Sequence, residues 1–225
     1  MSALTFTLKH TINHRLDCRR LTPDGLAGLS LQQILQLKLS PQHNYNSPLV
    51  ADFFEVSGND TENIIFRNCK QLDYIGHKMS HGKITAEDDA GDFLGTQMQN
   101  GIILCKKNVG DRAGDSMRRG LILIDGKTGD YCGSRMIAGT IGVFGSVGNY
   151  VGFSMKRGTI LLKNMPALHA TIQNCGTHTL PFLALLFRSF RSLPTAFNQI
   201  QTNRVQGFAG DLACNGNGEI LVISS

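Results

Sequence analysis

The chain has 225 residues, of which 41% are hydrophobic and 17% charged, and its formal net charge is +5 at pH 7. This hydrophobic content can fill a core, so a disordered chain is excluded, and the 25 glycines lack the every-third spacing of collagen. No stretch approaches the roughly 18 apolar residues that cross a bilayer, and no run of Lys or Arg exceeds two residues. We therefore expect neither a membrane nor a nucleic-acid partner. Because no secretory signal is recognised at the N-terminus, we expect a cytoplasmic protein.

The first element predicted in chain order is a short helix. Ser30-Leu-Gln-Gln33 has the form of a capping box. Leu31, Ile34 and Leu35 follow at helical spacing, and Pro41 is expected to end the segment. Residues 1–52 are thus predicted to form an N-terminal cap.

A 19-residue repeat dominates the middle of the chain. Met79, Met98, Met117, Met136 and Met155 keep this period, and so do Ile84, Ile103, Ile122, Ile141 and Ile160. Ile65 is placed in the same Ile column, which makes residues 53–72 a first, degenerate repeat. Two columns of glycine share the period: Gly76, Gly95, Gly114, Gly133 and Gly152, and Gly82, Gly101, Gly120, Gly139 and Gly158.

A period of 19 residues is too short for a pair of helices and suits one coil of short strands joined by tight corners. The predicted fold class is therefore all-β, a parallel β-helix with short helical caps at both ends. Ile84 and Ala86 point the same way by period-2 alternation, so each such column is expected to stack in the core. The two glycine columns are expected to supply positive φ or a close backbone approach at the corners.

One acidic column has two interpretations. Asp73, Asp92, Asp111 and Asp130, followed by Asn149, each precede the first glycine column by three residues. A short carboxylate at a corner can accept a hydrogen bond from a backbone N–H, and this is the favoured interpretation. The alternative is a cation held between the stacked carboxylates.

The C-terminal part is predicted to leave the repeat. Residues 167–177 are read as a last repeat, with Ile172 and Asn174 in phase. The segment from Pro181 to Phe190 has the pattern of an amphipathic helix that closes the open end or meets another subunit. Residues 208–222 read as strand, Gly-rich turn and strand. The predicted organisation is an N-terminal cap (1–52), a glycine-repeat β-helix (53–177) and a C-terminal helix and tail (178–225).

The chemistry-bearing residues predict binding rather than catalysis. The six cysteines form no C-x-x-C pair, and no nucleophile-and-base motif occurs, so neither a metal nor a catalytic residue is assigned. Arg118-Arg119 and Lys156-Arg157 share two columns before the second glycine column, and Arg135 lies nearby in the column before Met. Together they are predicted to form a basic stripe for an anionic partner, the alternative being a solvated or subunit-facing charged edge.

These motifs resemble a known family. The glycine repeat is similar to that of the C-terminal part of glutamate synthase and of the C subunit of formylmethanofuran dehydrogenase. Arg135-Met-Ile-Ala-Gly139, Met155-Lys-Arg-Gly158 and the tail Gly218-Glu-Ile-Leu-Val222 resemble the C subunit more closely. The resemblance covers nearly the whole chain.

The resemblance implies the non-catalytic C subunit of a formylmethanofuran dehydrogenase-like or formyltransferase/hydrolase complex of one-carbon metabolism. Such complexes reduce CO2 onto methanofuran, or move formyl from tetrahydromethanopterin to a methanofuran-type carrier and release formate. The implied partners are the amidohydrolase-like A subunit, the B subunit and the formyltransferase D subunit, which hold the metals. The chain itself would bind no cofactor but would contact the carrier, whose tail is acidic. The competing hypotheses are a structural module of a glutamate synthase-like amidotransferase and an independent β-helix enzyme.

Overall fold

Five short strands repeat at intervals of 19 residues along the centre of the molecule. The computed structural model describes residues 2–39 and 48–223, so Pro41, the predicted end of the first helix, lies outside it. Each strand pairs in parallel with the next, and Ile84, Ile103, Ile122, Ile141 and Ile160 lie side by side across them. The strands are β6 (Lys83–Ala86), β7 (Ile102–Cys105), β8 (Leu121–Ile124), β9 (Thr140–Val143) and β10 (Thr159–Leu162).

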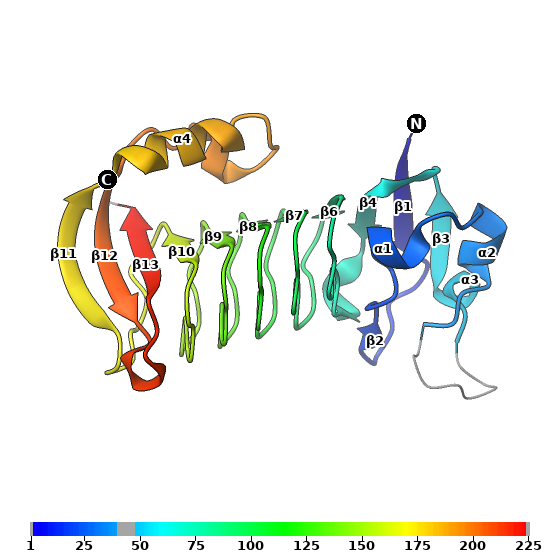
Figure 1. Ribbon diagram of the computed structural model, residues 1–225. Helices are drawn as coiled ribbons and strands as arrows, with labels where there is room; N and C mark the ends of the chain where they lie inside the picture. Colours follow the sequence, from blue (N-terminus) through cyan, green and yellow to red (C-terminus); the bar gives the residue numbers. More distant parts are fainter. Residues whose placement is uncertain (1, 40–47, 224–225) are drawn as a thin grey trace.

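These strands are the middle of one sheet of 11 strands, in the order β11-β12-β13-β10-β9-β8-β7-β6-β4-β1-β3 (Figure 1). Pairing is parallel from β13 to β1 and antiparallel at both ends. A second sheet pairs β2 (Leu16–Asp17) with β5 (Leu72–Asp73). The remaining strands are β1 (Ala3–Leu8), β3 (Phe54–Ser57), β4 (Asp60–Arg67), β11 (Gln173–Thr179), β12 (Arg204–Gly210) and β13 (Gly218–Ile223).

The predicted fold class, an all-β parallel β-helix with helical caps at both ends, is wrong. The strands form a mixed sheet, and they do not close into a solenoid, because the described residues between successive repeat strands are mostly turns and bends. The physical reason lies in the backbone of those turns. Each has several residues at positive φ, such as Arg112 (60°), Gly114 (68°) and Ser116 (57°), and an extended strand cannot include them.

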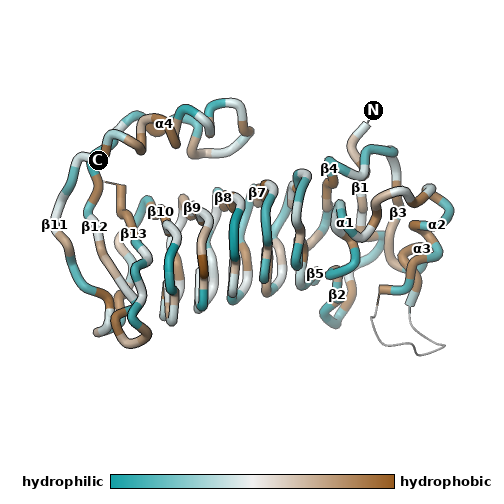
Figure 2. The backbone as a smooth tube through the Cα atoms, viewed as in Figure 1, coloured by the Kyte–Doolittle hydropathy of each residue, from teal (hydrophilic) through white to brown (hydrophobic). Residues whose placement is uncertain are grey.

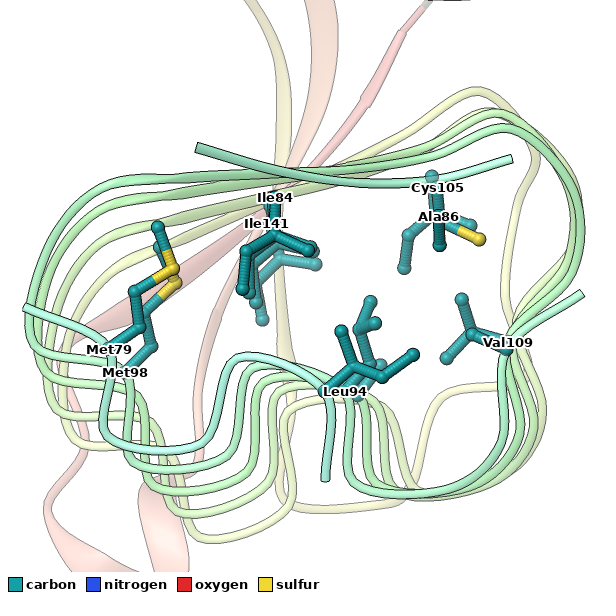
Figure 3. Packing of buried hydrophobic residues seen from close by; sticks show 14 of the residues in the cluster. Met79, Ile84, Ala86, Leu94, Met98, Cys105, Val109 and Ile141 are labelled. Atoms are coloured by element: carbon teal, nitrogen blue, oxygen red, sulfur yellow. The ribbon is translucent and has the colours of Figure 1, made fainter. Parts of the chain in front are cut away.

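The predicted stacking of columns inside the repeats is confirmed. Ile84 and Ile141 lie in one stack beneath the strands, and Met79 and Met98 lie in another near a corner (Figure 3). These four side chains are fully buried, as are the equivalent Ile and Met residues of the other repeats. Burying one such side chain contributes roughly 1.5–3 kcal/mol, so the columns supply much of the core's stabilisation. The two predicted glycine columns have φ between 66° and 103°, which confirms their role at corners.

The register of the first repeat differs from the prediction by one residue. Ile64, and not Ile65, pairs with Ile84 and is fully buried, while Ile65 pairs with Thr85. One extra residue therefore separates β4 from β6. The 3-10 helix Cys69–Gln71 takes up part of this connection.

The segment after the fifth repeat does not continue the parallel stacking. β10 pairs instead with β13, so that Ile160 lies beside Ile220. Residues 173–179 form β11, which pairs antiparallel with β12. The predicted strand, turn and strand of the tail are confirmed as β12, the 3-10 helix Leu212–Cys214 and β13.

Three short helices, α1 (Pro23–Leu26), α2 (Leu31–Leu35) and α3 (Val50–Phe53), lie at the N-terminal end. The capping box is confirmed: the Ser30 side chain accepts from the Gln33 N–H, and the Gln33 side chain accepts from the Ser30 N–H. None of the helices in the described parts of the chain is long and apolar enough to cross a membrane.

The amphipathic helix α4 (Pro181–Phe190) does not close the end of the sheet. Leu183, Phe187 and Phe190 pack against the outward face of the strands, on a cluster that includes Leu123 and Leu161. Figure 2 shows hydrophobic residues along α4 where it lies beside the sheet. The 3-10 helix Ala196–Gln199 joins the same cluster through Phe197.

Candidate functional site

Four of the predicted basic residues lie on two turns of the repeat stack. Arg118 and Arg119 are separated from β8 by a single glycine, and so are Lys156 and Arg157 from β10. One uncharged turn, with Ile137 and Ala138, separates the two pairs. Parallel strands lie about 4.8 Å apart, so the pairs are separated by roughly 10 Å. We call Arg118, Arg119, Lys156 and Arg157 the basic stripe.

The side chains of the basic stripe are exposed, and their charges are not compensated by any residue in the described parts of the chain. None of the four forms an ion pair or a side-chain hydrogen bond there. The backbone beneath them is fixed, because the Ile137 N–H donates to Met117 O at 2.8 Å and the Lys156 N–H donates to Met136 O at 2.8 Å. An array of unpaired cations on a rigid backbone is suited to binding an extended anion.

Arg135, the fifth predicted residue, has a different environment. Its guanidinium donates from Nε to Asp115 Oδ1 at 3.0 Å and from Nη2 to Asp115 Oδ2 at 2.6 Å. Asp115 also accepts from Ser134 Oγ at 2.5 Å, and its side chain is only 2% exposed. The hydrogen bonds from Arg135 to Asp115 raise the pKa of the Arg135 guanidinium. The charge of Arg135 is thus compensated, unlike those of the basic stripe.

The acidic column forms a ladder of hydrogen bonds. Asp73 Oδ1 accepts from the Asp92 N–H at 2.8 Å, and Asp92 Oδ1 accepts from the Asp111 N–H at 2.9 Å. The same contact links Asp111 to Asp130 and Asp130 to Asn149. The favoured interpretation, a carboxylate that accepts from a corner N–H, is confirmed. At the buried end of the ladder, burial raises the pKa of Asp73.

A stacked aromatic column is a feature to which sequence reasoning gave no role. Tyr74 and Phe93 stack with ring centroids 4.7 Å apart, and Tyr131 and Tyr150 stack at 4.9 Å. Arg112 occupies the same column and lies over the Tyr131 ring, 4.6 Å from its centroid. The signal was present in the sequence, because these five residues directly follow the acidic column in each repeat. Without the structure, the rings could not be distinguished from core residues.

Two open hollows lie at the N-terminal end, and neither contains a residue of the basic stripe. One of about 490 Å³ is lined by residues that include Lys9, His10, Asp88 and Lys107. The other, of about 450 Å³, is lined by Arg19, Arg20, Thr22, Asp24, Gly25, His77 and Lys78. In the described parts of the chain, no group of three His, Cys, Asp or Glu side chains is placed to hold a metal ion.

The positive charge of the protein is concentrated in its C-terminal part. Residues 131–225 contain seven Lys or Arg and two Asp or Glu, a surplus equal to the +5 of the whole chain. No Asp or Glu occurs between Asp130 and Asp211. The residues that precede this part have balanced charge, so an acidic partner would be attracted to one end of the molecule.

Comparison with known proteins identifies a structural relative. No protein-family model matches the chain, and no curated protein matches it. Among solved structures, it is similar to a chain of a multi-subunit enzyme complex. That complex is the formyltransferase/hydrolase complex (FhcABCD) from Methylorubrum extorquens, solved in complex with methylofuran. The likeness covers 98% of this chain and 100% of that chain, with 25% sequence identity and a TM-score of 0.64.

Proposed function

We propose that this protein belongs to a formyltransferase/hydrolase complex of one-carbon metabolism, in the position of its C subunit. The observation that carries the proposal is the extent of the structural likeness, which spans 98% of this chain and the whole of the other. A match over both full lengths includes the two antiparallel ends of the sheet as well as the repeats. The resemblance of the repeat and the Gly218–Val222 tail to the C subunit supports the same assignment.

In this proposal the chain is structural and the reaction takes place on sister subunits. The amidohydrolase-like A subunit, the B subunit and the formyltransferase D subunit would transfer formyl from tetrahydromethanopterin to a methanofuran-type carrier and release formate. The rigid stack of five repeats would hold these subunits in fixed positions. The solved relative is a complex with methylofuran, which supports a carrier of this type.

The basic stripe is proposed to bind the acidic tail of the carrier or an acidic surface of a sister subunit. The argument rests on four exposed cations in two pairs, roughly 10 Å apart. Each pair is carried on a turn whose backbone is hydrogen-bonded to its neighbours. A carboxylate-bearing tail could contact both pairs at once, and each charge-assisted contact would add to the affinity.

Isolation of the tagged protein from its source organism tests the assignment. We expect formyltransferase and amidohydrolase subunits to co-purify in fixed stoichiometry, and formyl transfer to be lost when the gene is deleted. Recovery as a monomer with an activity of its own, or together with amidotransferase subunits, would contradict the proposal.

Charge reversal tests the basic stripe. In the complex that carries Arg118→Glu, Arg119→Glu, Lys156→Glu and Arg157→Glu, we expect weaker assembly or weaker binding of the carrier. Lys70→Glu with Lys127→Glu is a control, because both side chains are exposed cations outside the stripe. Unchanged assembly and unchanged carrier affinity in the fourfold variant would exclude a role for the stripe.

A further inference from the structure

The outermost strand at the C-terminal end of the sheet is uncovered. β11 is the last strand of the sheet (Figure 1), and all seven of its residues are exposed. The other end is built differently. There, Phe54 of the edge strand β3 is buried in the core cluster that also includes Ile34 of α2 and Val50 of α3. An uncovered edge presents unpaired N–H and C=O groups, which readily pair with another strand.

Helix α4 leaves apolar side chains exposed directly after this edge. Pro181, its first residue, lies two positions after the end of β11. Phe182 is 45% exposed and Leu185 71% exposed, while Leu183, which faces the sheet, is fully buried. Large apolar side chains that remain exposed beside an open edge are typical of a surface that meets a partner.

The charges around this edge favour an acidic partner over a second copy of the chain. No Asp or Glu occurs from Asn164 to Gly210, and Arg204 of β12, which pairs with Thr179 at the end of β11, is exposed. Arg204 forms no ion pair with a residue in the described ranges. Two copies that met at this edge would bring like charges together, which is unfavourable. An acidic strand would be attracted instead.

We propose that a β-strand of an acidic sister subunit pairs with the outer edge of β11. The docking surface consists of that edge, the exposed side chains of Phe182 and Leu185, and the cation Arg204. Backbone hydrogen bonds to β11 supply the geometry, the apolar pair supplies buried area, and Arg204 favours an acidic chain. This inference rests on the proposed function, because its occupant is one of the sister subunits of the same complex.

Hydrogen–deuterium exchange on the free chain and on the purified complex tests the docking surface. We expect the amides of β11 to exchange at least about tenfold more slowly in the complex, because a new strand covers their edge. The amides of β8, which lies between two strands in the free chain, serve as the reference and should change little. Equal exchange of β11 in the two samples would overturn the inference.

A matched pair of variants measures the contribution of the side chains. Leu185→Asp with Arg204→Glu is expected to weaken binding to the purified sister subunits about tenfold or more. Met165→Asp with Lys127→Glu is the control, since it makes the same kinds of change at exposed positions outside the surface. It should change the affinity less than about twofold. Equal affinities of the two double variants would overturn the inference, and circular dichroism establishes that both are folded.

The remaining outcomes separate this inference from the proposed function. If the sister subunits assemble with the chain but β11 remains unprotected, the docking surface is wrong and the proposed function stands. If none of the sister subunits is found with the chain, both are wrong. A dimer of the free chain whose formation protects β11 at high concentration would assign the surface to a second copy and overturn the choice of an acidic partner.

Discussion

Asp115 and Arg135 form a two-contact ion pair between neighbouring repeats, with Nε–Oδ1 and Nη2–Oδ2 distances of 3.0 and 2.6 Å. The Asp115 side chain is almost completely buried, at 2% exposed, whereas the Arg135 side chain is 58% exposed. Removal of Arg135 and removal of Asp115 therefore have different free-energy costs. A buried carboxylate without its partner is costly, and an exposed guanidinium without its partner is not.

We expect Arg135→Gln to lower the free energy of unfolding by about 2–3 kcal/mol, because it leaves the Asp115 carboxylate buried with less compensation. Glutamine suits the backbone, since Gln97 occupies the same column at a φ of 56°. Urea unfolding followed by circular dichroism measures the change. Lys78→Gln is the control in the same column, and we expect it to cost less than about 0.5 kcal/mol. A similar loss in both variants would show that the ion pair contributes little.

We expect Asp111→Asn to preserve stability and Asp111→Ala to reduce it by about 1 kcal/mol. The reason is that Asp111 Oδ1 accepts from the Asp130 N–H at 2.8 Å, and an amide oxygen can accept this bond equally well. In a neighbouring column, Asn108 Oδ1 accepts from the Lys127 N–H at 2.9 Å. Thermal unfolding of the two variants makes the comparison. If Asn destabilised as much as Ala, the negative charge itself would be required, as for a bound cation.

Gly142 makes room for the ring of Phe197. The outward column holds Leu104, Leu123 and Leu161 in other repeats, but a Cβ on Gly142 would lie 2.9 Å from Phe197 Cζ. We expect Gly142→Leu to destabilise the protein by about 1–3 kcal/mol through overpacking, and Phe197→Ala by about 3–5 kcal/mol through a cavity. The double variant should cost less than the sum of the two, because the leucine fills the vacated space. Additive losses in urea unfolding would contradict this contact.

We expect stability to fall above about pH 8.5, where thiols of the unfolded chain ionise. Burial raises the pKa of Cys69 to about 11 and of Cys105 and Cys132 to about 12. The folded state therefore holds these protons more tightly, and its stability declines between the unfolded and folded pKa values. The slope is at most about 1.4 kcal/mol per pH unit for each thiol.

Cys105→Ala provides the comparison for the alkaline prediction, because Ala86 already occupies this column. The variant should show a shallower loss of stability between pH 9 and pH 11, measured by urea unfolding at each pH. Identical slopes in the two proteins would mean that the Cys105 thiol does not contribute. Cysteine labelling at pH 8 gives an independent check, since Cys175 is the exposed thiol among the described residues and should react first.

The repeated columns could be predicted from the sequence because they depend on local alternation and a constant period. Ile84 and its equivalents are buried as expected. The first register was not predictable from the Ile column alone, since Ile64 and Ile65 are identical residues and only Phe66, buried on the same side as Ile64, distinguishes them. The antiparallel ends depend on pairings between distant segments, such as Ile160 with Ile220, for which no local pattern exists.

The basic stripe could also be located from the repeat, since residues of one column stack. The partner of Arg135 could not, because the contact is diagonal: Asp115 lies 20 residues earlier and in a different column. A single Asp in a column that otherwise holds His77, Thr96, Ser134 and Phe153 was the available signal. The stacked rings were visible as a column, but whether they face the core or solvent depends on the path of the turns.

The position of β13 sets an order of assembly during synthesis. β11 and β12 precede β13 in the chain, yet β13 lies between them and β10 in the sheet. As the chain emerges from the ribosome, the repeats up to β10 can stack as they appear. The β11–β12 pair must wait until β13 has been made, because β13 is the strand that joins it to the rest of the sheet. Until then β10 is a temporary edge of the sheet. A chain that stalls on the ribosome after Gly210 would therefore leave the edge of β10 exposed, where it could pair with a strand of another chain.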